Sequence, residues 1–195
     1  MKKITRDEVK NIYEYEKIRN QFRQGIIELK NERRVQVGDL ISLVFENRET
    51  VLFQIQEMLR AERIVEEERI QEEIEIYNEL IPGDGSLSAT LLIEIQDQGR
   101  LREELIRFMG IDKGDTLFIR IEDRYTIPGI FEAGRSKEDK ISAIHYVKFP
   151  FTPEQREAFI KGEEEVFITI DHPNYKETVR LSEGVRKSLS EDLCR

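Results

Sequence analysis

The chain has 195 residues, of which 36% are charged and 38% hydrophobic, and its formal net charge is −9. No segment approaches the ~18 apolar residues of a membrane span, and the charged residues at the start predict no secretory signal. The single cysteine, Cys194, excludes an internal disulfide, and ten Phe and six Tyr exclude a disordered acidic chain. We therefore expect a soluble, cytoplasmic, globular protein that does not contact membranes.

The negative charge is concentrated in the middle of the chain. Residues 1–37 carry a net charge of +4, residues 38–97 carry −11, and residues 98–195 carry −2. Such an acidic surface repels a phosphate backbone, so we expect no nucleic-acid binding. Two interpretations of the acidic stretch are open: a solvated helix face, or a docking face for a basic protein partner. That partner could be the basic N-terminal segment, in the same chain or in a homodimer.

The first half of the sequence has the pattern of a helix-rich region. Apolar spacing and turn residues predict a short helix after Thr5, a helix over residues 14–34, a strand over 40–45, and helices over 48–62 and 66–80. Asn47 is a good N-cap for the second long helix. The segment Pro82 to Gly85 ends the last of these helices and is the clearest break in the chain.

The second half alternates between strands and helices. We predict strands over residues 87–95, 116–121, 141–149, 165–170 and 176–181, and helices over 99–109, from 152 onward, and over 182–193. The order over residues 87–170 is that of a ferredoxin-like fold. The predicted fold class is therefore α+β, in which a helix-rich region (residues 1–82) packs on a mostly antiparallel sheet (residues 83–195), in one continuous domain or two.

Well-known catalytic and cofactor-binding motifs are absent. The sequence contains no dinucleotide-binding glycine motif, no Walker A motif, no Glu-x-x-His pair and no nucleophile elbow. Cys194 lies one residue from the end, where a nucleophile would lack a rigid setting. We predict no cofactor from motifs, and a divalent metal is the alternative considered below.

Four segments resemble an uncharacterised bacterial family called domain of unknown function 3501. They are FENRETVLFQIQEMLR (residues 45–60), YNELIPG (77–83), SAIHYVKF (142–149) and HPNY (172–175). The resemblance covers nearly the whole chain and implies a cytoplasmic bacterial protein, but it supplies no activity. Proteins of this family are encoded near rubrerythrin-like and iron–sulfur oxidoreductase proteins, which implies an accessory role in redox or peroxide defence.

Several side chains that can do chemistry lie in or near these segments: Glu46, Arg48, Gln54, Glu57, Arg60, Glu79, Arg135 and His145. Glu46, Glu57 and His145 could together bind a divalent metal or act as acid–base groups. The alternative is a structural hydrogen-bond network. In that case Glu57 and Arg60 would pair along one helix, and Arg48 would bind a carboxylate of a neighbouring helix.

Both histidines and the long loop over residues 123–140 also have two interpretations. His145 shares a strand face with Ala143, Val147 and Phe149, so it is either a core histidine or a ligand. His172 either starts a turn or is a ligand. The segment from Arg135 to Lys137 is either an anion site or a solvated loop tip.

Two functions remain open from the sequence. The leading hypothesis is a non-catalytic accessory or interaction protein, linked to redox or oxidative stress by the family resemblance. The alternative is a metal-binding protein or an enzyme that uses Glu46, Glu57 and His145, with Arg48, Gln54, Arg60 and Glu79 as further members of a polar cluster.

Overall fold

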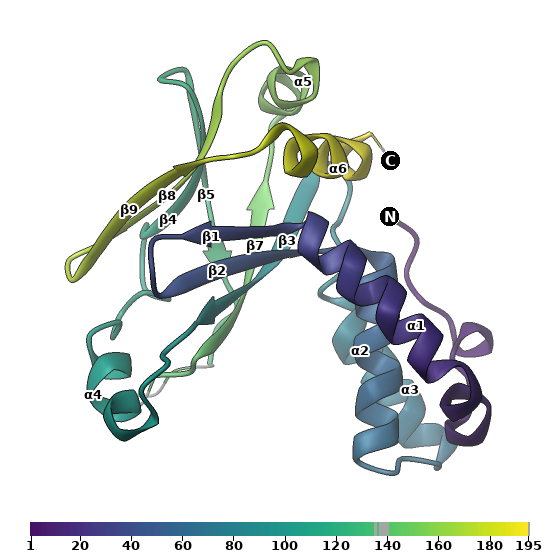
Figure 1. The fold of residues 1–195 in the computed structure, drawn as a ribbon. Helices are drawn as coiled ribbons and strands as arrows, with labels where there is room; N and C mark the ends of the chain where they lie inside the picture. The colour runs from purple at the N-terminus through teal and green to yellow at the C-terminus, as the bar shows by residue number, and fades with distance from the viewer. Residues whose placement is uncertain (135, 137–140, 195) are drawn as a thin grey trace.

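The computed structural model describes residues 1–134, 136 and 141–194, and it forms a sandwich of two β-sheets with a lobe of helices at one side (Figure 1). The helices are η1 (Arg6–Glu8), α1 (Ile12–Glu32), α2 (Arg48–Ala61), α3 (Glu67–Asn78), η2 (Gln98–Arg100), α4 (Leu101–Ile106), α5 (Pro153–Lys161) and α6 (Glu183–Leu193), where η denotes a 3-10 helix. The strands are β1 (Arg34–Val37), β2 (Ile41–Glu46), β3 (Ser86–Ile93), β4 (Leu117–Ile121), β5 (Tyr125–Pro128), β6 (Ile130–Phe131), β7 (Ile144–Pro150), β8 (Val166–His172) and β9 (Tyr175–Arg180). The predicted α+β class is confirmed.

The strands form two antiparallel sheets. Sheet A has the order β1-β2-β3-β7-β6, and sheet B has the order β5-β4-β8-β9. The ferredoxin-like order is therefore wrong, because β3 and β7 lie in sheet A while β4 and β8 lie in sheet B. Chain order alone does not decide which antiparallel strands pair, since the pairing depends on which apolar faces meet.

The chain passes from sheet B to sheet A at Gly129, between β5 and β6. A Cβ atom at this position would lie 2.8 Å from a methyl carbon of Val147, so the crossing requires glycine. The short strands β1, β5 and β6 were not predicted. They become strands through their partners in the sheets, because two to four residues are too short for a local pattern to predict a strand.

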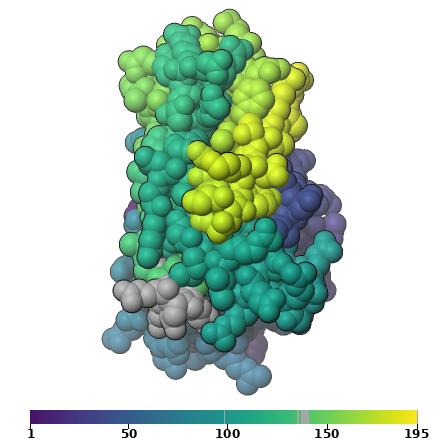
Figure 2. All heavy atoms as spheres, turned by 90° about the vertical axis from the view of Figure 1, so that its left-hand side faces the viewer, coloured from purple at the N-terminus to yellow at the C-terminus, as the bar shows by residue number. Residues whose placement is uncertain are grey.

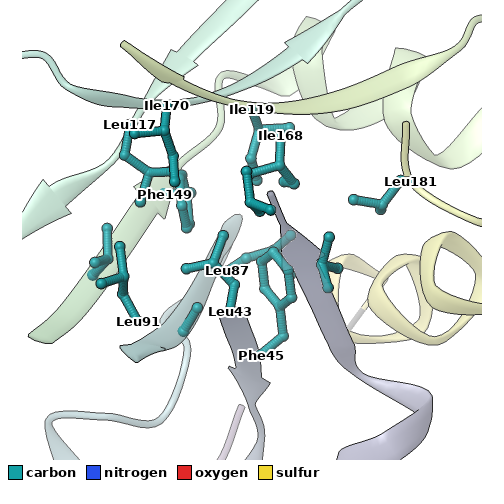
Figure 3. Packing of buried hydrophobic residues seen from close by; sticks show 14 of the residues in the cluster. Leu43, Phe45, Leu87, Leu91, Leu117, Ile119, Phe149, Ile168, Ile170 and Leu181 are labelled. Atoms are coloured by element: carbon teal, nitrogen blue, oxygen red, sulfur yellow. The ribbon is translucent and has the colours of Figure 1, made fainter. Parts of the chain in front are cut away.

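The main hydrophobic core lies between the two sheets (Figure 3). Alternate residues of each strand point into it, as the period of two in a strand requires. Sheet A contributes Leu43, Phe45, Leu87, Leu91 and Phe149, and sheet B contributes Leu117, Ile119, Ile168 and Ile170, all of which are buried. The opposite side chains of sheet A therefore point away from the core.

The β8–β9 hairpin forms one edge of sheet B, with β9 next to β1, and the C-terminal part of the chain faces the viewer in Figure 2 (yellow). His172 ends β8, as the predicted turn requires, and its Nε2 atom lies 3.0 Å from the carbonyl oxygen of Met109. The backbone N–H of Asn174 donates to His172 Nδ1 over 3.3 Å, so both ring nitrogens have structural partners.

On the neighbouring strand, the Tyr175 hydroxyl donates to the carbonyl oxygen of Val37 and accepts from the Leu40 N–H, which connects sheet B to the β1–β2 turn.

The helical lobe has a second, smaller core. It is formed by buried aliphatic side chains of α2, α3 and the N-terminal segment: Ile4, Val9, Val51, Ile55, Leu59, Ile64, Ile70, Ile74, Leu80 and Ile81. The predicted boundary at residues 82–83 falls within the part of the chain that builds sheet A. Strands β1 and β2 precede this boundary, and strands β3 and β7 follow it. The two predicted regions therefore share one sheet. No helix of the described residues is long and apolar enough to cross a membrane.

The basic N-terminal segment packs on the acidic middle of the same chain. Lys3 pairs with Glu79, Arg6 with Glu67, and Arg19 with Glu57, at N–O distances of 2.8, 2.6 and 2.7 Å. The N-terminal segment therefore forms ion pairs with the acidic stretch within one chain. Glu66, Glu68, Glu72 and Glu75 of the same acidic stretch are exposed, in agreement with a solvated helix face.

Candidate functional site

Glu57 and Arg60 of α2 are structural residues that hold α1 in place. Glu57 accepts hydrogen bonds from the Tyr15 hydroxyl and from Arg19, while Arg60 binds Glu16. The predicted pairing of Glu57 with Arg60 is wrong. Helix α1 lies alongside α2 and supplies the partners of both residues instead. The Arg19 guanidinium lowers the pKa of Glu57, and burial raises the pKa of Tyr15.

Arg48 binds a carboxylate across the helix packing, as predicted. Its guanidinium contacts Glu8 of η1 and donates to the carbonyl oxygen of Lys2 over 3.1 Å. A hydrogen bond from the Thr5 backbone N–H and the contact with Arg48 lower the pKa of Glu8 to about 2. Arg48 therefore anchors the N-terminal segment to the start of α2.

His145 is buried, as its place on an apolar strand face predicts. Its Nε2 atom lies 2.8 Å from the carbonyl oxygen of Ser142, and its Nδ1 atom lies 3.9 Å from the Asp112 carboxylate. Among the described residues, no group of three His, Cys, Asp or Glu side chains could hold a metal ion. The structure thus does not bring Glu46, Glu57 and His145 together. Arg135 and Lys137 lie outside the described residues.

Glu46 occupies a different environment, on the face of sheet A that points away from the main core. Glu46, Ser88, Lys148 and Ile130 lie directly opposite one another on β2, β3, β7 and β6. A cavity of about 320 Å³ lies over this row. It is lined by Glu46, Glu79, Leu80, Ser88, Ala89, Ile130, Phe131, Glu132, Tyr146, Val147 and Lys148. We call it the Glu46 pocket.

Within the described part of the chain, the Glu46 carboxylate is held by neutral donors. It accepts hydrogen bonds from the hydroxyls of Thr50 and Thr90 and, over 3.0 Å, from the side-chain amide of Gln54. The Glu46 residue is only 2% exposed, and no basic group of the described part of the chain forms an ion pair with it. Burial of a carboxylate without a cation is costly, and three hydrogen bonds offset only part of that cost.

The position of Glu46 follows from the local sequence. Glu46 is the last residue of β2, and Asn47 begins α2 by accepting hydrogen bonds from the backbone N–H groups of Glu49 and Thr50. The side chains of Thr50 and Gln54 follow on one face of α2, four residues apart, and both reach the carboxylate. A strand end and a helix start therefore meet at one carboxylate.

Glu79 lies at the rim of the pocket and is neutralised there. Lys3 lies 2.8 Å and Lys148 lies 3.6 Å from its carboxylate oxygens. The hydrogen bond from Lys3 is the main cause of the lowered pKa of Glu79. The positive charge of Lys148 is thus directed to Glu79.

Sequence reasoning identified Glu46, Gln54 and Glu79 but missed three other members of the site, Thr90, Tyr146 and Lys148. The available signal was the period of two in the strands. Thr90 lies between buried Ala89 and Leu91, and Tyr146 and Lys148 alternate with buried residues of β7. Alternation indicates that these side chains share faces, but only the strand register brings them beside Glu46.

The fold and the pocket define an α+β protein in which a lobe of helices lies beside a sandwich of two sheets, with the pocket on the outer face of sheet A. The chain belongs to the family described as "Protein of unknown function (DUF3501)", whose model matches residues 3–193. The predicted family is confirmed. The chain is also similar to a crystal structure of a novel protein of unknown function from Burkholderia pseudomallei K96243. The two sequences are 32% identical, with 98% of this chain and 100% of that chain covered, and the TM-score is 0.90. A comparison with curated proteins found no match.

Proposed function

We propose that this protein is a non-catalytic accessory protein that acts by binding, and that the Glu46 pocket is its ligand site. One observation carries the proposal: a buried carboxylate, with which no basic group of the described residues pairs, lines a cavity of about 320 Å³. Ligand sites have volumes of roughly 300–1,000 Å³ and combine apolar walls with a few placed polar groups. The Glu46 pocket has this composition.

The walls of the pocket support binding rather than a purely structural role for Glu46. Leu80, Phe131 and Tyr146 supply apolar surface, and Ile130 at the edge of sheet A is 56% exposed. A carboxylate needed only for packing would be cheaper to replace by an apolar side chain. We infer that the exposed apolar rim and the buried charge together serve a bound molecule.

Binding can be tested by nuclear magnetic resonance with ¹⁵N-labelled protein and four one-ring probes: benzylammonium, benzamidinium, benzyl alcohol and benzoate. At least one probe should cause saturable shifts of the Ser88, Tyr146 and Lys148 amides. Ile130→Trp, which covers the pocket rim, should weaken this binding. Val65→Trp is the matched control, because Val65 is exposed at 64% and does not line the pocket. If no probe shifts these amides, the proposal is wrong.

The redox link is the second part of this proposal, and its support is the family resemblance. If the accessory role lies in peroxide defence, deletion of the gene should lower survival of the host in hydrogen peroxide. Complementation with the wild-type gene should restore survival. Equal survival of the deletion strain and the wild type would contradict the redox link and leave the binding function standing.

A further inference from the structure

We propose that the ligand of the Glu46 pocket is an organic cation, with a primary ammonium or amidinium group on an apolar body. This inference rests on the proposed binding function and specifies the ligand chemistry. The cationic group would lie against the Glu46 carboxylate, and the apolar body would lie between the strands of sheet A and the end of α3.

The charges around the pocket support a cation. Two of the carboxylates that line it differ in their partners: Glu79 is neutralised by Lys3 and Lys148, whereas Glu46 binds neutral donors among the described residues. The nearby Arg33 guanidinium binds the backbone carbonyl oxygen of Glu46 and the Asp192 carboxylate, so among the described residues no basic group pairs with the Glu46 carboxylate. A cationic ligand would therefore meet an attractive potential at the Glu46 end of the pocket.

The hydrogen bonding of Glu46 leaves room for one further donor. An ionised carboxylate has about four acceptor positions, and Thr50, Gln54 and Thr90 occupy three. Two of these donors bind Oε2, whereas Thr90 alone binds Oε1, so the remaining position is on Oε1. A charged N–H donor there would supply the counter-charge that the described residues do not, and such bonds are about twice as strong as neutral ones.

The donors around Glu46 also favour an organic cation over a metal ion. Thr50 and Gln54 present hydrogen atoms to the carboxylate, and a metal would need to displace them. No second carboxylate or imidazole hydrogen-bonds at this point, and the described residues contain no metal-binding group of three. The apolar side chains of Leu80, Phe131 and Val147 offer a matching surface for a hydrocarbon body.

The same set of probes tests the charge preference, because the four compounds share a ring and differ mainly in charge. Benzylammonium or benzamidinium should bind at least about tenfold more tightly than benzyl alcohol or benzoate. A tenfold difference in the dissociation constant corresponds to about 1.4 kcal/mol of binding free energy. Glu46→Gln should reduce cation binding by at least about tenfold, since it removes a buried charge partner. Glu68→Gln is the control, because Glu68 is exposed and does not line the pocket, and it should change cation binding by less than about twofold.

A second variant keeps the test decisive if Glu46→Gln does not fold, as judged by circular dichroism. Ile130→Lys places a positive charge at an exposed rim position, so the fold should persist. It should weaken benzamidinium binding more than benzyl alcohol binding, and an equal loss for the two probes would contradict the cation inference. Benzyl alcohol or benzoate binding as tightly as the cations would overturn the cation inference while supporting the binding function. No binding of any probe would overturn both.

Discussion

Arg33 at the end of α1 and Asp192 of α6 form an ion pair whose side chains are only 2% and 4% exposed. Arg33 also donates to the carbonyl oxygens of Phe45 and Glu46, at 2.9 and 3.3 Å, and to the Ser188 hydroxyl. One guanidinium therefore joins α1, the end of β2 and the terminal helix α6. This contact supports the backbone from which the Glu46 side chain projects.

Replacement of Arg33 should destabilise the protein strongly. Removal of one member of a buried ion pair costs about 3–5 kcal/mol, so we expect Arg33→Met to lower the free energy of unfolding by that amount in urea denaturation. Arg34→Met is the neighbouring control. The Arg34–Glu94 pair is 40% and 36% exposed, and surface pairs contribute about 0–1 kcal/mol. Equal losses in the two variants would contradict the structural role of Arg33.

Loss of the Asn47 cap should weaken the start of α2 next to Glu46. The Asn47 side chain accepts from the backbone N–H groups of Glu49 and Thr50, both over 3.0 Å. Asn47→Ala should lower the free energy of unfolding by about 0.5–2 kcal/mol, whereas Asn47→Ser should retain most of the stability because serine also caps. Thermal and urea unfolding would measure both variants. A serine variant as unstable as the alanine variant would show that capping is not the cause.

Acid should destabilise the attachment of the N-terminal segment through Glu8. Its folded-state pKa of about 2 lies below the ordinary value of 4.5. The contribution of Glu8 to stability is therefore present above about pH 4.5 and is lost as the pH falls toward 2. Glu8→Gln should flatten the acid limb of a plot of unfolding free energy against pH. Glu68→Gln, which removes an exposed carboxylate of α3, is the control, and an unchanged acid limb in Glu8→Gln would contradict this assignment.

The Tyr175 hydroxyl should stabilise the contact between the two sheets. It donates to the Val37 carbonyl over 2.7 Å and accepts from the Leu40 N–H over 3.1 Å. Tyr175→Phe removes both hydrogen bonds and should cost about 1–3 kcal/mol. Amide hydrogen exchange should also become faster at Leu40. Unchanged exchange at Leu40 would contradict the prediction.

Alkaline pH gives a second measurement of the same contact. Burial raises the pKa of Tyr175 above its ordinary value of 10. The folded state therefore retains the phenol proton at a pH at which the unfolded chain loses it, and this stabilisation falls as the pH rises above 10. Tyr175→Phe should reduce this alkaline loss of stability relative to the wild type.

Much of the secondary structure could be predicted because its signals are local. The helix over α2 follows from a capping residue and an apolar stripe, and β7 follows from alternation of buried and outward residues. The basic and acidic stretches also predicted the packing of the N-terminal segment. The short strand β6 could not be predicted, because its two residues gain their structure from pairing with β7.

The sequence by itself determined the α+β class, the positions of the main helices and strands, and the family. The tertiary structure decided that the strands form two sheets, and it separated Glu46 from Glu57 and His145. It also placed Thr90, Tyr146 and Lys148 beside Glu46, through the pairing of β2 with β3 and of β3 with β7. The physical reason is that helix caps and periodicity depend on residues that are close together in the chain. Strand register and the packing of one sheet on the other depend instead on the burial of apolar side chains from distant segments.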